Sequence, residues 1–561
     1  PQQRVMDLAG DGTQDIVLLG TLTGYYQRDA DGEWRNFQSF ESTPNVDWAD
    51  PNLRFIDLNG DGRADILITQ DELLVWYPSR SRQGFGAAET VRKAQDEEQG
   101  PALVFADGTQ SVYLADMSGD GLNDLVRIRN GEVCYWPSLG YGRFGTRVTM
   151  AGAPWFDHPE LFDQRRVRLA DIDGSGTTDI LYLGREEIAI WLNQAGNSFQ
   201  QYGTQPGERR ITAFPTVDDL AAVQAIDLLG NGTACLVWSS PLPGQGLQPM
   251  RYIDLMGGQK PHLMTSVVNN LGAETKLQYA ASTKFYLQDR REGKPWITRL
   301  PFPVHVVERV ETIDHLTGNR FVSLYRYRHG YFDGEEREFR GFGYVEQTDT
   351  EAYAELAKGN LFPVGTNEAE SSHMPPVQTR TWFHTGAFID REHLSTYFAE
   401  TEYYREPRHR IPEGATEAER QRIEAEFQAM LLPDTVLPDG ITLQDGTKLD
   451  DYELIAQEER EACRALKGSV LRQEVYALDG TAEASHSYTV TESNYTIRQV
   501  QPRQDGQYGV FFVHPRESLA YHYERHPEDP RVAHQITLEV DRFGNVLKSV
   551  AIAYPRRNRA S

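Results

Sequence analysis

Hydrophobic positions in the first 240 residues fall in short runs that alternate with acidic, glycine-containing segments. The runs IVLL, ILIT, LVRI and ILYL each come directly after such a segment. Short apolar runs bounded by turn residues are typical of β-strands. About twenty residues after each acidic segment begins, an aromatic side chain falls in a second apolar run, at Tyr26, Trp76, Trp136 and Trp191. The pattern predicts a repeated unit of antiparallel strands in which the acidic segments are turns.

The acidic segments recur five times at a nearly constant spacing. The copies are DLAGDGTQDI, DLNGDGRADI, DMSGDGLNDL, DIDGSGTTDI and DLLGNGTACL, which begin at Asp7, Asp57, Asp116, Asp171 and Asp227. Their first aspartates are 50, 59, 55 and 56 residues apart. A period of this length indicates an array of similar supersecondary units, and β-propeller blades are the leading candidate.

In the best copies, positions 1, 3, 5 and 9 carry oxygen side chains, and a main-chain carbonyl is available at position 7. Alternate oxygen ligands on a turn that contains glycine are the arrangement that binds Ca²⁺. Copies two and four are the best candidates, whereas copies one and three are weaker because position 3 is Ala9 or Ser118, and copy five has lost its ligands. The candidate ligands are Asp57, Asn59, Asp61, Arg63 (through its carbonyl) and Asp65; Asp171, Asp173, Ser175 and Asp179; and, in the weaker copies, Asp7, Asp11, Asp15, Asp116, Ser118, Asp120 and Asp124.

The same acidic residues also have a purely structural interpretation. Asp and Asn side chains accept hydrogen bonds from the main chain one or two residues further on, and glycine supplies the positive φ that such turns require. The sequence leaves the calcium site and the simple turn as two open alternatives.

The composition narrows the function classes. The formal charge of −26 disfavours nucleic acid and anionic membrane surfaces as partners. No run of 18 apolar residues occurs, so we expect no direct membrane insertion. The three cysteines are far apart, and Cys134 and Cys235 lie in strand-like contexts where we expect them to pack in the core. This sparse usage fits a protein made in the bacterial cytoplasm and then secreted.

After residue 245 the chain is β-rich without the same period. Residues 263–281 predict a hairpin, and residues 301–313 and 321–332 alternate apolar and polar side chains, which is typical of a sheet with two different faces. The capping box at Thr416 and Glu419 predicts a helix, and a second helix is expected from about Asp450 to Leu466. The expected domains are 1–245, a β-propeller; 246–360, a middle β region; 361–535, its continuation with a helical insertion at 416–467; and 536–561, the start of a repeat.

Two further segments could carry chemistry. Residues 331–345 combine charges and aromatics, and we interpret them as a tight β connection rather than as a catalytic or sugar-binding loop. His522, Glu524 and His526 would share one face of a strand and could bind a metal, although a solvated face is the favoured interpretation. No HExxH, GxSxG, P-loop or Rossmann motif occurs, so the sequence predicts no enzyme.

The acidic segments resemble the FG-GAP, or VCBS, repeats of integrin-like propellers. They are followed by VVNNLGAETKLQY, PVHVVERVE, RHGYFDGEEREFRGFGYVE and a final VDRFGNVL that resembles the start of a tyrosine-aspartate (YD, or RHS) repeat. This order of parts is similar to the B component of bacterial Tc toxin complexes, the SpvB/TcaC-type insecticidal toxin proteins, over essentially the whole chain. We expect the chain to be a fragment, because it begins at Pro1 within a predicted blade strand and ends near the start of the YD repeats.

The resemblance implies a fold and a role. The expected fold is mainly β, with an FG-GAP β-propeller that is six-bladed in the family, at least five blades of it here, followed by an extended β-sheet shell with a small helical insertion. The implied function is a non-catalytic scaffold. Its propeller docks on and gates a pore-forming A component, and its shell, together with a YD/RHS-repeat C component, encloses the toxic polypeptide.

Two other functions stay open at this point. One is a calcium-dependent, integrin-like adhesin or carbohydrate-binding surface protein. The other is a polysaccharide lyase or hydrolase built on a propeller, which would require carboxylates or basic residues that converge in the channel.

Overall fold

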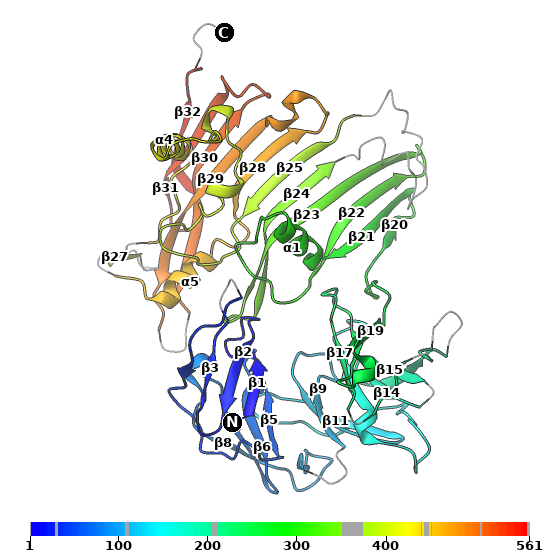
Figure 1. Cartoon of the computed structure of the whole chain (residues 1–561). Coiled ribbons are helices and arrows are strands. Elements are labelled where there is room, and N and C mark those ends of the chain that lie inside the picture. The colour runs from blue at the N-terminus through cyan, green and yellow to red at the C-terminus, as the bar shows by residue number, and fades with distance from the viewer. Residues whose placement is uncertain are drawn as a thin grey trace. The chain divides into compact units, whose positions relative to one another are not determined.

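The structure is a computed structural model, and its chain forms two compact β units (Figure 1). The described residues are 2–28, 32–106, 111–185, 187–204, 210–212, 214–218, 220–349, 374–438, 440–442, 448–449, 452–504 and 508–557. The propeller unit comprises Pro1–Leu263, Pro301–His305 and Asp333–Glu338, and the sheet unit comprises Met264–Leu300, Val306–Phe332 and Phe339–Ser561. Each unit is described by itself.

The propeller unit contains five antiparallel blades among the described residues, which confirms the predicted fold. Four blades have four strands each and the fifth has three. In chain order the blades are β1 (Gln2–Met6), β2 (Asp15–Leu19), β3 (Gly24–Tyr26) and β4 (Gln38–Ser39); β5 (Leu53–Ile56), β6 (Asp65–Thr69), β7 (Leu73–Tyr77) and β8 (Glu89–Arg92); β9 (Val112–Ala115), β10 (Asp124–Arg129), β11 (Glu132–Trp136) and β12 (Val148–Thr149); β13 (Val167–Ala170), β14 (Asp179–Leu183), β15 (Ile188–Gln194) and β16 (Ser198–Tyr202); and β17 (Ala222–Ile226), β18 (Cys235–Ser239) and β19 (Met250–Asp254).

Each acidic segment is the loop between the first two strands of a blade. The ninth residue of the segment always lies opposite the residue that precedes the first aspartate. These pairs are Met6–Asp15, Ile56–Asp65, Ala115–Asp124, Ala170–Asp179 and Ile226–Cys235. One loop geometry is therefore repeated in all five blades, as the constant length of the segments predicts.

The cores of the propeller unit lie between neighbouring blades. Val17 and Leu19 of the first blade pack with Ile66 and Ile68 of the second. The third and fourth blades meet in the same way, and Trp191 is part of their shared cluster. Full burial of each such side chain contributes about 1.5–3 kcal/mol, so the predicted apolar runs hold adjacent blades together. Cys134 and Cys235 are buried, as predicted.

The sheet unit is one 13-stranded sheet. Its main path runs in the order β20-β21-β22-β23-β24-β25-β28-β29-β30-β31-β32, and β26 and β27 pair beside β29. The bounds are β20 (Ser266–Val268), β21 (Ala273–Ala281), β22 (His305–Asp314), β23 (Asn319–Asp333), β24 (Glu338–Asp349), β25 (Val377–Phe383), β26 (Ile441–Thr442), β27 (Lys448–Leu449), β28 (Val470–Ala477), β29 (Thr489–Gln501), β30 (Val510–His522), β31 (Arg531–Val540) and β32 (Val546–Ala553). The predicted hairpin at 263–281 is β20–β21, and residues 331–345 contain the end of β23, the turn at 334–337 and the first part of β24.

Helices are short and few in the described residues. They are α1 (Ser282–Arg291), α3 (Ala399–Glu402), α4 (Glu417–Gln428) and α5 (Ala456–Arg464), with 3₁₀ turns at Ser81–Gln83, Gln164–Arg166, Pro243–Gln245, Pro407–His409 and Ala482–Ser485. The capping box that begins α4 is confirmed, because the Glu419 main-chain N–H donates to Thr416 Oγ1 and the Thr416 N–H donates to Glu419 Oε2. Helix α5 begins later than predicted, at Ala456, because Glu458 accepts the main-chain N–H of Ile455 and caps the helix there. None of these helices is both long and apolar enough to span a bilayer.

The chain between β25 and β28 covers one face of the sheet. We call the described part of residues 384–469 the covering segment. Its contacts to the sheet include hydrogen bonds from main-chain N–H groups to buried carboxylates. The Tyr404 N–H donates to Glu474 Oε1 at 2.8 Å, and the Leu432 N–H donates to Glu492 Oε2 at 2.9 Å. This segment and the sheet beneath it enclose the cavity described below.

Candidate functional site

The first aspartate of every acidic loop organises the main chain of its own loop. Its carboxylate accepts the N–H of the residue five positions later, which is a glycine in all five copies, over 2.6–2.9 Å. The glycines adopt positive φ, from 74° at Gly232 to 95° at Gly176. The fifth residue of each loop adds the Asx- or Ser-type turn of the structural interpretation, because its side-chain oxygen accepts the N–H two residues further on in every copy.

The ninth aspartate has a second repeated role in copies two, three and four. Each is fully buried and accepts two main-chain N–H groups, one seven residues earlier and one fourteen residues later. For Asp179 the donors are Ile172 at 2.9 Å and Asn193 at 2.7 Å. Burial raises the pKa of Asp65 and Asp179 to about 7 and that of Asp124 to about 6. In copy one the buried Asp15 lies 3.4 Å from Arg82 Nε.

The fourth loop brings carboxylates together. Asp171, Asp173 and Asp179 each place an oxygen within 4.8 Å of the others. Asp173 Oδ2 also lies 2.8 Å from His262 Nε2, and Ser175 Oγ contacts Thr177 Oγ1 at 3.1 Å. Carboxylate oxygens this close can supply three of the roughly six to eight oxygen ligands that Ca²⁺ takes, so this loop is the best candidate for Ca²⁺.

The second loop, predicted to be equally good, is arranged differently. The Asn59 side-chain amide donates to Asp61 Oδ2 at 3.2 Å, while Asp61 Oδ1 accepts the Arg63 N–H at 2.9 Å. Asp57 is engaged by Gly60 and Gly62, and Asp65 by Leu58 and Ser79. The corresponding Asp171 and Asp179 of the fourth loop accept main-chain N–H groups in the same way, so the two loops differ in the contact between Asn59 and Asp61. The weaker copies likewise use their oxygens on main-chain N–H groups: Asp7, Asp11, Asp116, Asp120 and Asp124. Calcium binding stays a prediction, and the fourth loop is the best candidate for it.

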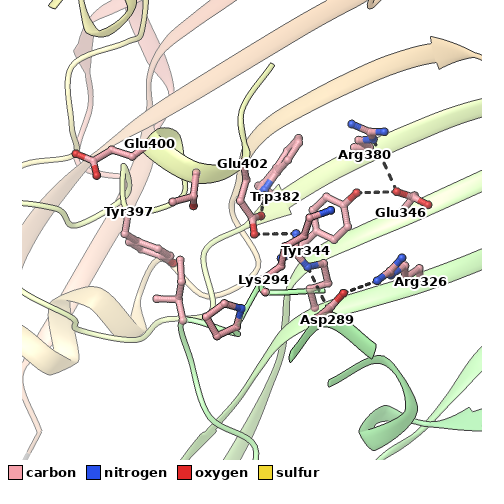
Figure 2. Close-up of a pocket in the computed structure, with 15 residues that line it drawn as sticks. Asp289, Lys294, Arg326, Tyr344, Glu346, Arg380, Trp382, Tyr397, Glu400 and Glu402 are labelled. Atoms are coloured by element: carbon pink, nitrogen blue, oxygen red, sulfur yellow. Dashed lines mark hydrogen bonds and ion pairs between the residues drawn. The ribbon is translucent and has the colours of Figure 1, made fainter. Parts of the chain in front are cut away.

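The sheet unit contains a cavity of about 510 Å³ between the covering segment, the loop after α1 and strands β23, β24 and β25 (Figure 2). A cavity of this size lies within the usual range for small-ligand sites, about 300–1,000 Å³. Charged and aromatic side chains dominate its lining. The lining residues are Asp289, Gly293, Lys294, Pro295, Ile297, Arg326, Arg328, Tyr344, Glu346, Arg380, Trp382, Tyr397, Glu400, Thr401 and Glu402.

One wall of the cavity is a chain of buried charges. Arg328 connects two carboxylates, since its Nε lies 3.2 Å from Asp289 Oδ2 and its terminal nitrogen lies 2.8 Å from Glu402 Oε1. Asp289 also accepts the indole N–H of Trp296 at 2.8 Å, and Arg326 pairs with it. Glu402 accepts the indole N–H of Trp382 at 2.8 Å. Its partners, with His329 first among them, hold the pKa of Glu402 below its usual value despite burial.

Sequence analysis did not find this site. Its members come from β23, β24, β25, α1 and α3, which are joined only by the folded sheet. One local signal was present, because Arg326 and Arg328 are two positions apart in a strand and therefore share a face.

The predicted His–Glu–His group does not form on one strand. Strand β30 ends at His522, and Glu524 and Arg525 both have positive φ, so the chain turns before His526. Among the described residues, the metal-compatible group is the aspartate trio of the fourth loop. The charged connection at 331–345 is a structural element, in which Arg340 donates to the Gly386 carbonyl at 2.8 Å.

Comparison with known proteins identifies the family. Residues 193–386 match the middle/N-terminal region of the insecticide toxin TcdB, and residues 461–561 match its middle/C-terminal region. Residues 7–68 match an FG-GAP-like repeat. The chain belongs to the TcdB insecticidal toxin family. This confirms the resemblance on which the expected fold was based.

Solved structures match this TcdB-type chain over 100% of its length. In the Photorhabdus luminescens Tc holotoxin pore it matches one chain with a TM-score of 0.78 and 31% identity, and covers 23% of that chain. In the crystal structure of TcdB2-TccC3 the TM-score is 0.66, the identity 28% and the share of that chain 27%. The chain thus spans about a quarter of the length of the solved chains it matches. No curated protein matches it in sequence.

Proposed function

We propose that this chain is a non-catalytic scaffold of a bacterial toxin complex. The observation that carries the proposal is the match of the whole chain to a chain of the Tc holotoxin pore at 31% identity. The matches to TcdB2-TccC3, and to that assembly with Cdc42 at 27% identity, support the same role.

The two units would bind different partners. The propeller unit would dock on and gate a pore-forming A component, since blades around a central channel present short, protected edges and can close a conduit. The sheet unit would form part of the shell around the toxic C-component polypeptide. Its edge strand β20 is exposed at all three of its residues, and such a strand can pair with a strand of a YD/RHS-repeat partner.

The charged groups of the cavity support a role without catalysis. Asp289 and Glu402 are held by arginine, histidine and tryptophan partners, as expected for residues that shape a wall. A general acid or base instead needs a proton that it can exchange with a substrate.

Calcium would act as a structural ion in the propeller unit. Asp171, Asp173 and Asp179 would hold it, and it would offset the repulsion between these carboxylates. We further propose synthesis in the bacterial cytoplasm followed by secretion, which is compatible with three free, buried cysteines.

Partner binding tests the proposal. The full chain is mixed with a YD/RHS-repeat C component and, separately, with a pore-forming A component, and each mixture is measured by size-exclusion chromatography with light scattering. We expect a stable complex in both cases. Elution of the chain alone, at its own mass of 63.6 kDa, in both mixtures would overturn the proposal.

A matched pair of variants locates the C-component contact. Val268 lies on the edge strand β20 and is exposed, and Val268→Lys adds a charge that opposes strand pairing. Leu247 is fully exposed in the propeller unit, and Leu247→Lys serves as the control. Val268→Lys is expected to weaken binding to the C component and Leu247→Lys to leave it unchanged.

A further inference from the structure

The charged wall of the cavity in the sheet unit gives no expected gain in stability over an apolar wall of the same volume. Asp289 is fully buried, and the Arg328 and Glu402 side chains are only 12% and 7% exposed. Buried ion pairs are often no more stabilising than apolar side chains of the same volume, because both charges lose their hydration. A wall of this kind gives the cavity a polar surface with fixed hydrogen-bonding groups, which an apolar wall would not provide.

A strained residue stands behind this wall. His329 is buried in β23 with a φ of 57°, a left-handed conformation that costs an L-residue roughly 1–2 kcal/mol. Its Nδ1 accepts the Ile297 N–H at 3.0 Å, so its Nε2 donates to Glu402 Oε1 at 2.8 Å. His329 is therefore a positioning residue for Glu402. Backbone strain of this kind concentrates at ligand-binding sites, where the surrounding structure maintains it.

The rim of the cavity offers charged groups of both signs. The Arg380 Nε donates to Gln378 Oε1 at 2.9 Å and lies 3.7 Å from Glu346 Oε2, and its guanidinium centre lies 4.5 Å over the Tyr476 ring. Glu400 is exposed, and none of the described residues makes a hydrogen bond or an ion pair with its carboxylate. In Figure 2, Glu400 lies on the side of the site opposite Arg380 and Glu346. Lys294, whose side chain is mostly exposed and lies 3.8 Å from Glu292 Oε2, adds a second basic group to the lining.

We propose that this cavity binds a short peptide segment that carries side chains of both charges. Four basic and four acidic side chains line it, so it has no formal net charge within a strongly acidic chain. A purely anionic ligand would meet Glu346 and Glu400, and a purely cationic ligand would meet Arg380 and Lys294. A peptide supplies both charges at fixed spacing together with main-chain groups for the polar lining.

Calorimetry with defined peptides tests this proposal. The full chain is titrated with four capped hexapeptides: alternating Lys and Glu, all Lys, all Glu and all Gln. The alternating peptide is expected to bind at least about tenfold more tightly than the other three, which corresponds to about 1.4 kcal/mol. A free Lys-Glu dipeptide, added as a fifth ligand, distinguishes a peptide segment from a small zwitterion. Equal affinities, tighter binding of all Lys, or dipeptide binding as tight as that of the alternating hexapeptide would overturn the proposal.

Variants at the rim make the test specific to the site. Arg380→Gln and Glu400→Gln are each expected to weaken binding of the alternating peptide roughly tenfold, because each removes one charge-assisted contact. The Glu400→Gln variant should bind the all-Glu peptide more tightly than the unmodified chain does, because it lacks one repelling carboxylate. The Arg380→Gln variant should likewise bind the all-Lys peptide more tightly than the unmodified chain does.

Lys548→Gln, on the distant strand β32, is the matched control and should change none of these affinities. Because the Glu400 side chain is exposed and bears no fold-stabilising contact, Glu400→Gln keeps the test valid even if Arg380→Gln unfolds. Unchanged binding of the alternating peptide by Glu400→Gln would contradict the proposal. The titration uses the chain without its partners, so a negative result would contradict only the peptide proposal. Failure of the chain to bind the A and C components would contradict only the scaffold proposal.

Discussion

Carboxylates are buried in both units, but their partners lie at different distances along the chain. In the propeller unit, Asp179 accepts N–H groups that are 7 and 14 residues away. In the sheet unit, Glu474 accepts the Tyr404 N–H from 70 residues away, and Glu492 accepts that of Leu432 from 60 residues away. A carboxylate of the propeller unit therefore shapes its own blade, whereas one in the sheet unit holds together distant segments.

The kind of partner, main chain or side chain, determines what a substitution can repair. Main-chain N–H groups cannot be replaced, so the loss of a propeller aspartate cannot be compensated by a second substitution. A buried ion pair in the sheet unit can be replaced as a pair, because each partner mainly satisfies the other. The four predictions below use this contrast.

The largest effect is expected for Arg320→Met in the sheet unit. Arg320 and Glu311 form a buried ion pair between β23 and β22. Removal of the arginine leaves the Glu311 charge buried, and we expect the free energy of unfolding to fall by about 3–5 kcal/mol in urea denaturation. The double variant Arg320→Met with Glu311→Leu should recover most of this loss. A double variant as unstable as the single one would refute the account of the pair.

The second effect is expected for Asp179→Ala in the propeller unit. The Ile172 and Asn193 N–H groups would lose their acceptor inside the protein, and we expect a loss of about 2–4 kcal/mol in the same urea assay. Asp124→Ala should behave similarly, since Met117 and Ser138 bond to Asp124 in the same way. Asp120→Ala, at an exposed position, is the matched control. An Asp179→Ala variant no less stable than the control would count against the bridging role.

The third effect is a pH dependence that comes from His384 of the sheet unit. This buried, neutral imidazole donates from Nε2 to the Leu394 carbonyl and accepts the Gly386 N–H at Nδ1. Burial lowers its pKa to about 4. Because the unfolded chain takes up the proton near pH 6.5, stability is lost as the pH falls from 6.5 towards 4, by about 2 kcal/mol at pH 5.

His384→Gln removes this titrating group while it keeps a donor and an acceptor. Urea denaturation at pH 7 and pH 5 should therefore show a smaller loss for the variant than for the unmodified chain. The same loss in both proteins would show that other groups cause the acid sensitivity.

The smallest effect is expected for calcium. At a calcium concentration ten times its Kd, binding to the fourth loop would add about 1.4 kcal/mol of stability. Asp173→Ala should therefore lower the melting temperature more in calcium than in chelator, and Asp61→Ala tests the second loop in the same way. Equal losses in both conditions would show that these loops are turns without a bound ion.

The sequence predicts the propeller unit well because its structure is specified locally. The acidic segments fix where the strands begin, and the ninth residue pairs at the same place in every blade, from Asp15 to Cys235. The capping box at Thr416 is predictable for the same reason. What distinguishes the fourth loop from the second could not be predicted, because the side-chain contacts between Asn59 and Asp61 form only in the folded loop.

The site in the sheet unit could not be predicted, because its contacts connect remote positions. Arg326 meets Asp289 across 37 residues, and His329 meets Glu402 across 73 residues. The sequence places Arg326 and His329 on an alternating strand, but it predicts no helix at Asp289 or Glu402. Which strands become neighbours depends on the order of the whole sheet, and in particular on the covering segment that separates β25 from β28 in the chain.

Hydrogen exchange of the full chain, measured alone and with each partner, tests the central functional claim most directly. The account predicts that the C component protects main-chain amides of the sheet unit and that the A component protects amides of the propeller unit. Protection of the propeller unit by the C component and of the sheet unit by the A component, or no protection by either partner, would contradict it.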